Sequence, residues 1–189
     1  MNGMNGKNIT LALLALVMAA TRLSPLSGLA HLQDASWAVF FLAGFFLTSQ
    51  WRWAFPALMA EAVVIDCIAI RYFGVSNYCV TVAYWFLVPS YAVLWVGGSW
   101  LRRHQSFDLR GLAGLVLSLV VALSVCFLIS NGSFYWLGGR VAEGTWNGWL
   151  SNMSDWYWPL VRVPLVYVGA VALVYAVIPR ARAVWEAGG

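Results

Sequence analysis

The sequence predicts an all-α, polytopic membrane protein that forms one integral membrane domain over residues 1–189. Of these residues 62% are hydrophobic and only 10% are charged, whereas an ordinary soluble domain carries roughly 25% charged residues. The apolar residues also gather in long runs that short polar or basic segments separate. A soluble fold of this length could not bury so much apolar surface, but lipid can solvate it. We therefore expect a six-transmembrane-helix bundle.

The apolar runs, and the Gly, Pro and polar residues between them, define six expected spans. They are approximately residues 9–20, 35–48, 54–70, 78–96, 112–130 and 157–178. A complete crossing needs about 20 residues, which the last three spans provide and the first three do not. Short helices either tilt little or end beside a polar cavity. Lys7 and residues 9–20 also resemble a secretory signal peptide, but further spans follow rather than a soluble domain, so we expect a retained first helix.

The positions of Lys and Arg predict that both ends of the chain lie inside the cell. In this N-in/C-in arrangement the inner set is Lys7, Arg52, Arg102, Arg103, Arg110, Arg180 and Arg182. The outer set is Arg22, Arg71, Arg140 and Arg162. The outer loops, residues 21–34, 71–77 and 131–156, are longer than the inner ones and richer in Gly, Asn, Asp and aromatic residues. We expect the functional surface there, because function concentrates in long and chemically varied loops.

Composition and motifs exclude several function classes. The chain has no G-x-x-x-x-G-K-[ST] phosphate loop and no dinucleotide-binding fingerprint. We expect no nucleotide cofactor, so any uphill transport would draw on a partner or a gradient. The net charge of +4 comes from short basic clusters between apolar spans, which gives no reason to expect a nucleic-acid partner. Three cysteines without a C-x-x-C motif predict neither a disulfide framework nor a dithiol oxidoreductase.

Few charged residues lie at membrane depth. Glu61 is in the middle of the third expected span, Asp66 is near its outer end, and Arg162 is near the outer end of the sixth. An isolated charge in lipid costs a few kcal/mol, so each of these groups needs a partner or a water-filled cavity. We expect a contact between Asp66 and Arg162, which would serve either as a structural ion pair between two helices or as part of a ligand site.

Cys79 opens the fourth expected span and should lie at the outer mouth of the bundle. A thiol at a helix N-terminus is more readily ionised, and a thiolate is a strong ligand for soft or borderline metals. The alternative for Cys79 is a simple packing role, which we also expect for Cys67 and Cys126 within apolar spans. His31, in the first outer loop, could join Cys79 as a second ligand to haem iron or cobalt.

Two further patterns concern surfaces. Residues 133–158 contain five of the twelve tryptophans, which predicts either an aromatic belt at the membrane interface or a lid over a cavity mouth. In the first span, Ala15 and Ala19 are four residues apart, a spacing of small residues that permits close approach of another helix.

Short helices, long outer loops, the Ala15–Ala19 pair and the absence of an ATPase motif resemble the substrate-binding S-component of energy-coupling-factor (ECF) vitamin transporters. Residues 60–66 (AEAVVID) and 76–85 (SNYCVTVAYW) resemble more closely the BtuM type, a small cobalamin-specific group. The architecture covers the whole chain, whereas the closer likeness covers only these two segments.

The resemblance implies a membrane subunit that captures cobalamin (vitamin B12) in an outward-facing cavity and mediates its uptake. A thiolate at Cys79 would coordinate cobalt. Asp66, Tyr84 and His31 would bond corrin amides or support the cysteine, and Arg71 or Arg162 could contact the phosphate of the ligand. These proteins are transporters rather than enzymes, although a thiolate ligand could also displace cyanide from cyanocobalamin.

The same likeness implies a multi-pass protein of the bacterial cytoplasmic membrane. It leaves open whether an ECF coupling module contacts Ala15 and Ala19 or the chain works alone. Two other function classes stay open: a membrane haem or redox protein that uses Cys79 and His31 as axial ligands, and an assembly subunit without a ligand.

Overall fold

The computed structural model describes residues 2–23, 33–74, 76, 80–104 and 109–177. These residues form helices and connecting turns without a β-strand, which confirms the all-α class. The α-helices are α1 (Asn2–Arg22), α3 (Ser36–Phe46), α4 (Trp51–Tyr72), α5 (Leu87–His104), α6 (Leu109–Leu137) and α7 (Trp146–Val177). The short 3₁₀ helices are η1 (Thr48–Gln50) and η3 (Val82–Phe86).

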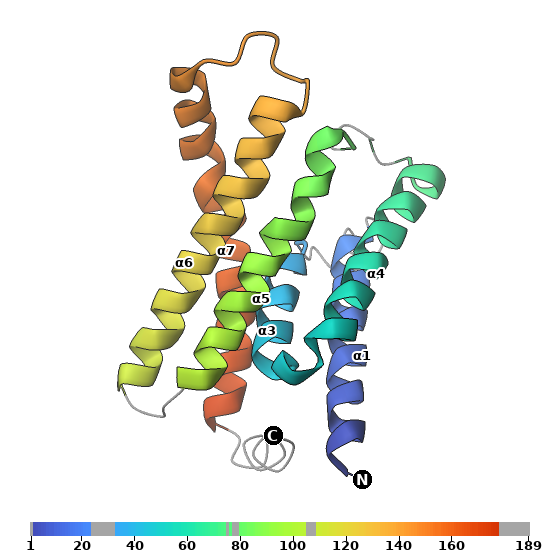
Figure 1. Cartoon of the computed structure of the whole chain (residues 1–189), viewed down its shortest axis with the longest axis vertical. Coiled ribbons are helices and arrows are strands. Elements are labelled where there is room, and N and C mark those ends of the chain that lie inside the picture. Colours follow the sequence, from blue (N-terminus) through green and yellow to red (C-terminus); the bar gives the residue numbers. More distant parts are fainter. Residues whose placement is uncertain (1, 24–32, 75, 77–79, 105–108, 178–189) are drawn as a thin grey trace.

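The helices alternate in direction along the bundle (Figure 1). α1, α4 and α6 run away from the end where the chain begins, and α3, α5 and α7 return toward it. α7 therefore ends where α1 starts, as an N-in/C-in chain requires. We call this end the basic end and the opposite one the cavity end.

Four segments are long and apolar enough to cross a membrane: Thr48–Tyr72, Val82–His104, Leu109–Leu137 and Trp146–Ala176. This gives the chain the character of a multi-pass membrane protein. Of the three spans expected to be short, only the second is short, as α3 with 11 residues. The other two were underestimated, because α1 has 21 residues and α4 has 22. A search for apolar runs does not detect these helical ends, because the first turns of α1 contain polar residues and the first turn of α4 contains Arg52.

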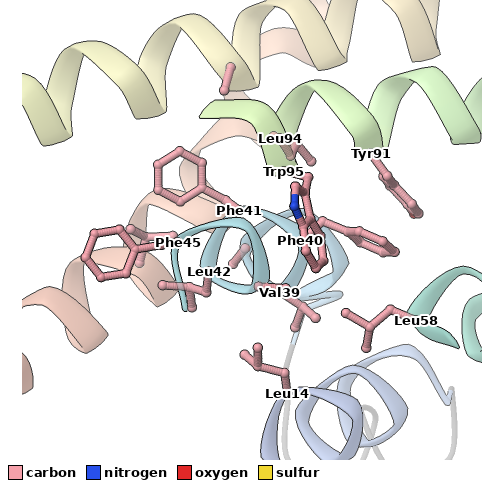
Figure 2. Packing of buried hydrophobic residues seen from close by; sticks show 14 of the residues in the cluster. Leu14, Val39, Phe40, Phe41, Leu42, Phe45, Leu58, Tyr91, Leu94 and Trp95 are labelled. Carbon is pink, nitrogen blue, oxygen red and sulfur yellow. The ribbon is translucent and has the colours of Figure 1, made fainter. Parts of the chain in front are cut away.

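α3 is the centre of the core. Nine of its eleven residues are buried, which suits a helix that is hydrophobic on all sides. Figure 2 shows Phe40 and Phe41 of α3 among residues of the surrounding helices, with α5 on one side and Leu14 of α1 on the other. The ring of Phe40 stacks on Tyr91 of α5 at a centroid distance of 4.2 Å. A helix of 11 residues is only about 16 Å long, so α3 cannot fill the full height of the bundle.

Glycines let α3 and α5 approach closely. A Cβ atom on Gly44 of α3 would overlap the backbone of Trp95, and one on Gly98 of α5 would overlap the backbone of Phe41. The hydroxyl of Ser99 also donates a hydrogen bond of 3.0 Å to the carbonyl of Gly44. Small residues and side-chain hydrogen bonds are the usual means of joining helices in lipid.

The segment 131–156, expected to be a long outer loop, is mostly helical. α6 continues to Leu137 and α7 begins at Trp146, so residues 138–145 alone connect them. The two helices extend past their neighbours at the cavity end (Figure 1). Near their tips, Trp136, Trp146 and Trp149 contact one another in sequence, with ring centroids 5.1 and 5.6 Å apart. The apolar run ended at residue 130 because aromatic and small polar residues follow it, although they continue the helix.

Candidate functional site

A half-open cavity of about 660 Å³ lies at the cavity end, beyond the short α3. Residues of α1, α3, α4, η3, α5, α6 and α7 line it, so the whole bundle contributes. Its polar and charged lining groups are Arg22, Gln33, Asp34, Asp66, Ser76, Tyr84, Tyr91, Ser130, Asn131 and Arg162. Its apolar walls include Trp37, Leu87, Phe127, Phe134 and Leu160. A helix that ends early beside a polar cavity was one interpretation of the short spans, and α3 fits it.

The strongest contact in the cavity joins Arg22, the last residue of α1, to Asp66 of α4. Nε of Arg22 donates to Oδ1 of Asp66 at 2.6 Å, and Nη2 donates to Oδ2 at 2.7 Å. Two parallel N–H···O bonds to one carboxylate give both strength and fixed geometry. The side chains are 12% and 21% exposed, so water screens this ion pair only weakly.

The remaining guanidinium nitrogen of Arg22 connects two more helices. Nη1 donates to Oγ of Ser36 at 2.8 Å and to the hydroxyl of Tyr91 at 3.1 Å. It also lies 3.3 Å from Oδ2 of Asp34. Arg22 therefore joins α1 to the start of α3, to α4 and to α5.

Tyr84 of η3 completes the arrangement around Asp66. Its hydroxyl donates to Oδ2 of Asp66 at 2.7 Å. The carboxylate of Asp66 thus accepts three hydrogen bonds, two from Arg22 and one from Tyr84. It is held in one orientation on the cavity wall, and Tyr84 fixes η3 to α4.

The expected contact between Asp66 and Arg162 is wrong. Within the described part of the chain, Asp66 forms its ion pair with Arg22. Arg162 is exposed, lines the cavity from α7 and has no ion pair with another described residue. The sequence predicted a similar depth for Asp66 and Arg162, but only the tertiary arrangement decides which arginine reaches α4.

His31 and Cys79 lie outside the described residues. The chain on both sides of Cys79 does line the cavity, through Ser76 and Val80, and so do Gln33 and Asp34, which follow His31 closely in sequence. The helix expected to open at residue 78 begins instead with η3 at Val82, and α5 follows from Leu87 to His104.

The other two cysteines differ from each other. Cys126 is fully buried in the core, as expected. Cys67 is exposed on the outer face of α4, so its expected burial is wrong. An apolar span does not show which of its faces meets the bundle and which meets lipid.

Sequence reasoning missed most of the polar residues that line the cavity, and two of them, Arg22 and Asn131, are distinctive. Arg22 was assigned only to the outer basic set, although its position at the end of an apolar helix was a signal. Asn131 lies on α6, and its Oδ1 atom is buried without a hydrogen-bond partner among the described residues. A buried amide oxygen without a partner costs about 1–3 kcal/mol, which marks Asn131 as a group that a ligand could satisfy.

The lid interpretation of the aromatic segment is not supported by the lining of the cavity. From residues 133–158 only Phe134 belongs to it. The cluster of Trp136, Trp146 and Trp149 lies at the helix tips instead. These residues fit the alternative of an interfacial aromatic group.

Among the described residues, no group of three or more His, Cys, Asp or Glu side chains could hold a metal ion. The cavity itself combines aromatic and aliphatic walls with fixed polar groups. Comparisons with protein-family models and with curated proteins found no match to this chain.

Proposed function

We propose that this protein captures cobalamin in the cavity and mediates its uptake across a bacterial cytoplasmic membrane. One observation carries the proposal: Asp66, Tyr84 and Arg162 all line a single half-open cavity. Val80, next to Cys79, and Gln33, two residues after His31, line it as well. Arg71, the other arginine considered for the phosphate, does not line the cavity.

The chemistry of the cavity suits a large, flat ligand with an amide fringe. Aromatic walls such as Trp37 and Phe134 offer broad apolar surfaces, and a few fixed polar groups would set the orientation of the ligand. The carboxylate of Asp66 can accept a further hydrogen bond from an amide. Arg162, without an ion pair in the described structure, can contact a phosphate.

Cobalt recognition would come from Cys79, whose thiolate would bind the metal as an axial ligand. Asp66 and Tyr84 would then hold the corrin amides or the cysteine-bearing segment. A thiolate that replaces cyanide on cobalt would also account for removal of cyanide from cyanocobalamin as a side activity.

The transporter proposal includes a six-helix S-component arrangement with both ends in the cytoplasm. If a coupling module is used, α1 is the helix that would contact it. Ala15 and Ala19 are half-buried, and Ala15 already packs on the core. The exposed face of α1 carries Ile9, Leu13 and Leu16, so a partner would meet these larger residues beside the alanines.

The decisive experiment is absorption spectroscopy of protein purified from cells supplied with cobalamin. Wild-type protein should carry corrinoid bands. Cys79→Ala should lose the thiolate-dependent cobalt spectrum, whereas the control Cys67→Ala, which removes an exposed thiol outside the cavity lining, should retain it.

Three outcomes contradict parts of the proposal in different ways. A wild-type protein without bound corrinoid overturns cobalamin capture. A Cys79→Ala protein with an unchanged cobalt spectrum overturns thiolate ligation but leaves capture intact. A Soret band in place of corrinoid bands assigns the chain to the haem alternative with Cys79 and His31.

A further inference from the structure

A second cavity, of about 540 Å³, lies at the basic end of the molecule. It is a groove between α5 and the segment formed by η1 and the start of α4. Its walls are apolar and mostly aromatic, with Phe55, Trp95, Val96 and Trp100 among them. Phe55 and Trp95 contact each other edge to face, with ring centroids 5.6 Å apart, and so connect the two sides of the groove.

Positive charge gathers where this groove reaches the end of the bundle. Arg103 and His104, in the last turn of α5, line it. Arg103 is exposed and has no ion pair among the described residues. On the opposite side, the ammonium of Lys7 donates to Ser49 of η1 at 3.3 Å, and Arg52 lies over the ring of Trp51, 5.9 Å from its centroid. No carboxylate is among the described residues that line the groove.

His104 is already engaged within this end of α5. Its Nδ1 atom is 2.9 Å from the carbonyl of Trp100, and the two rings stack at a centroid distance of 4.6 Å. This contact holds the ring of Trp100 along the groove. Arg103 is then the cation of the groove lining that is available to bind a ligand.

We propose that the groove binds an anionic phospholipid of the leaflet at the basic end. Its acyl chain would lie along Val96 and Phe55, and its phosphate would meet Arg103. An apolar groove that ends at the guanidinium of Arg103 matches the apolar chain and anionic headgroup of such a lipid. Basic pockets between membrane helices bind anionic headgroups. The site is separate from the cobalamin cavity, so it does not depend on the identity of the transported ligand.

Native mass spectrometry of detergent-purified protein titrated with dioleoyl lipids tests the site. Wild-type protein should bind phosphatidylglycerol more tightly than phosphatidylcholine. Arg103→Gln should weaken phosphatidylglycerol binding about fivefold, since one basic residue contributes roughly that factor to an anionic lipid contact. The matched control Arg110→Gln, at the same end on α6 but outside the groove lining, should leave the preference unchanged.

A second variant tests the acyl part without changing charge. Ala92 lines the groove and is half-buried, so Ala92→Leu should narrow it and weaken binding of both lipids. The proposal is overturned if the two lipids bind equally to wild-type protein, or if Arg103→Gln and Arg110→Gln have the same effect. Competition by inorganic phosphate at millimolar concentration would also overturn it, because a free anion would then suffice.

Discussion

At the scale of residues, the feature that organises the cavity is the guanidinium of Arg22. It forms two short bonds to Asp66 and further contacts with Ser36 and Tyr91, which lie on three different helices. A buried charge is tolerated only when its partners replace water. Here the partners also form the cavity wall, so the ion pair that stabilises the bundle fixes the ligand-facing carboxylate as well.

Replacing Arg22 should therefore affect both stability and binding. Arg22→Met leaves Asp66 without its cation and should destabilise the protein by about 3 kcal/mol. Arg22→Lys keeps the charge but loses the two-pronged geometry, and its effect should be intermediate. Thermal unfolding in detergent measures both. The control Arg71→Met, an exposed residue one to two turns further along α4, should be close to neutral; an equal loss for both methionine variants would contradict the assignment.

Asn131 should show opposite effects on stability and binding. Its amide oxygen is buried without a described partner, so Asn131→Leu removes an unsatisfied group at similar size. We expect the ligand-free protein to gain about 1 kcal/mol in stability. Cobalamin affinity should fall at the same time, because the ligand loses a polar contact. Thermal unfolding and corrinoid titration of the same preparations measure the two effects. A loss of stability with unchanged cobalamin affinity would show that Asn131 has a structural role instead.

At the scale of elements, α3 explains where the cavity lies. It is short and buried on nearly all sides, and it is held against α5 by contacts that only glycine permits. The longer helices around it continue beyond its first residue, which leaves the space that Asp34 and Trp37 border. The cavity is thus a consequence of one helix that is shorter than its neighbours.

Added bulk in the α3–α5 contact should be costly. In Gly44→Ala the new methyl group would overlap the backbone of Trp95, which cannot move aside as a side chain could. We expect a loss of about 3 kcal/mol or failure to fold. Gly114→Ala on α6 is the matched control, because nothing lies within 4 Å of its added Cβ. It should gain roughly 0.5 kcal/mol from helix propensity. Thermal unfolding compares the two, and similar stabilities would refute the close packing.

At the scale of the whole molecule, the alternating helices separate two chemically different ends. The basic end has Arg52, Arg102 and Arg103, whereas the cavity end has the Arg22–Asp66 pair and the extended tips of α6 and α7. Basic segments remain preferentially on the cytoplasmic side during insertion. In the orientation that we propose, the cavity would open to the outside.

Reporter fusions test this orientation. Alkaline phosphatase inserted between residues 138 and 145, in the link between α6 and α7, should be active, because the proposed orientation puts that link outside. A fluorescent protein fused after the end of the chain should be fluorescent, since α7 returns to the basic end. The reverse pattern would show that the protein has the opposite orientation. If both reporters were found on the same side of the membrane, α7 would not cross it.

Much of the fold was predictable because lipid imposes a simple rule on composition. The apolar runs located the six α-helices of the described residues, and the distribution of Lys and Arg separated the two ends of the bundle. The boundaries were less predictable. Polar and aromatic residues can continue a helix past its apolar part, as they do from residue 131 to Leu137 in α6.

The site was predictable in part. Asp66 and Tyr84 were selected because they lie in the two segments that carry the resemblance. In the structure they share a hydrogen bond. Arg22 and Asn131 were not selected, since each belongs to a helix distant in sequence from that pattern. Which face of α4 turns inward was also hidden, as the exposed Cys67 next to Asp66 illustrates.

The sequence by itself determined the chemical class of the molecule: an all-helical chain with the apolar runs of a membrane protein and few charged groups among them. It did so because hydrophobic length and charge are local properties of a chain. The tertiary structure alone decided that Asp66 pairs with Arg22 rather than with Arg162. Depth along the membrane can be read from sequence, but the neighbour across the bundle depends on how helices pack around α3.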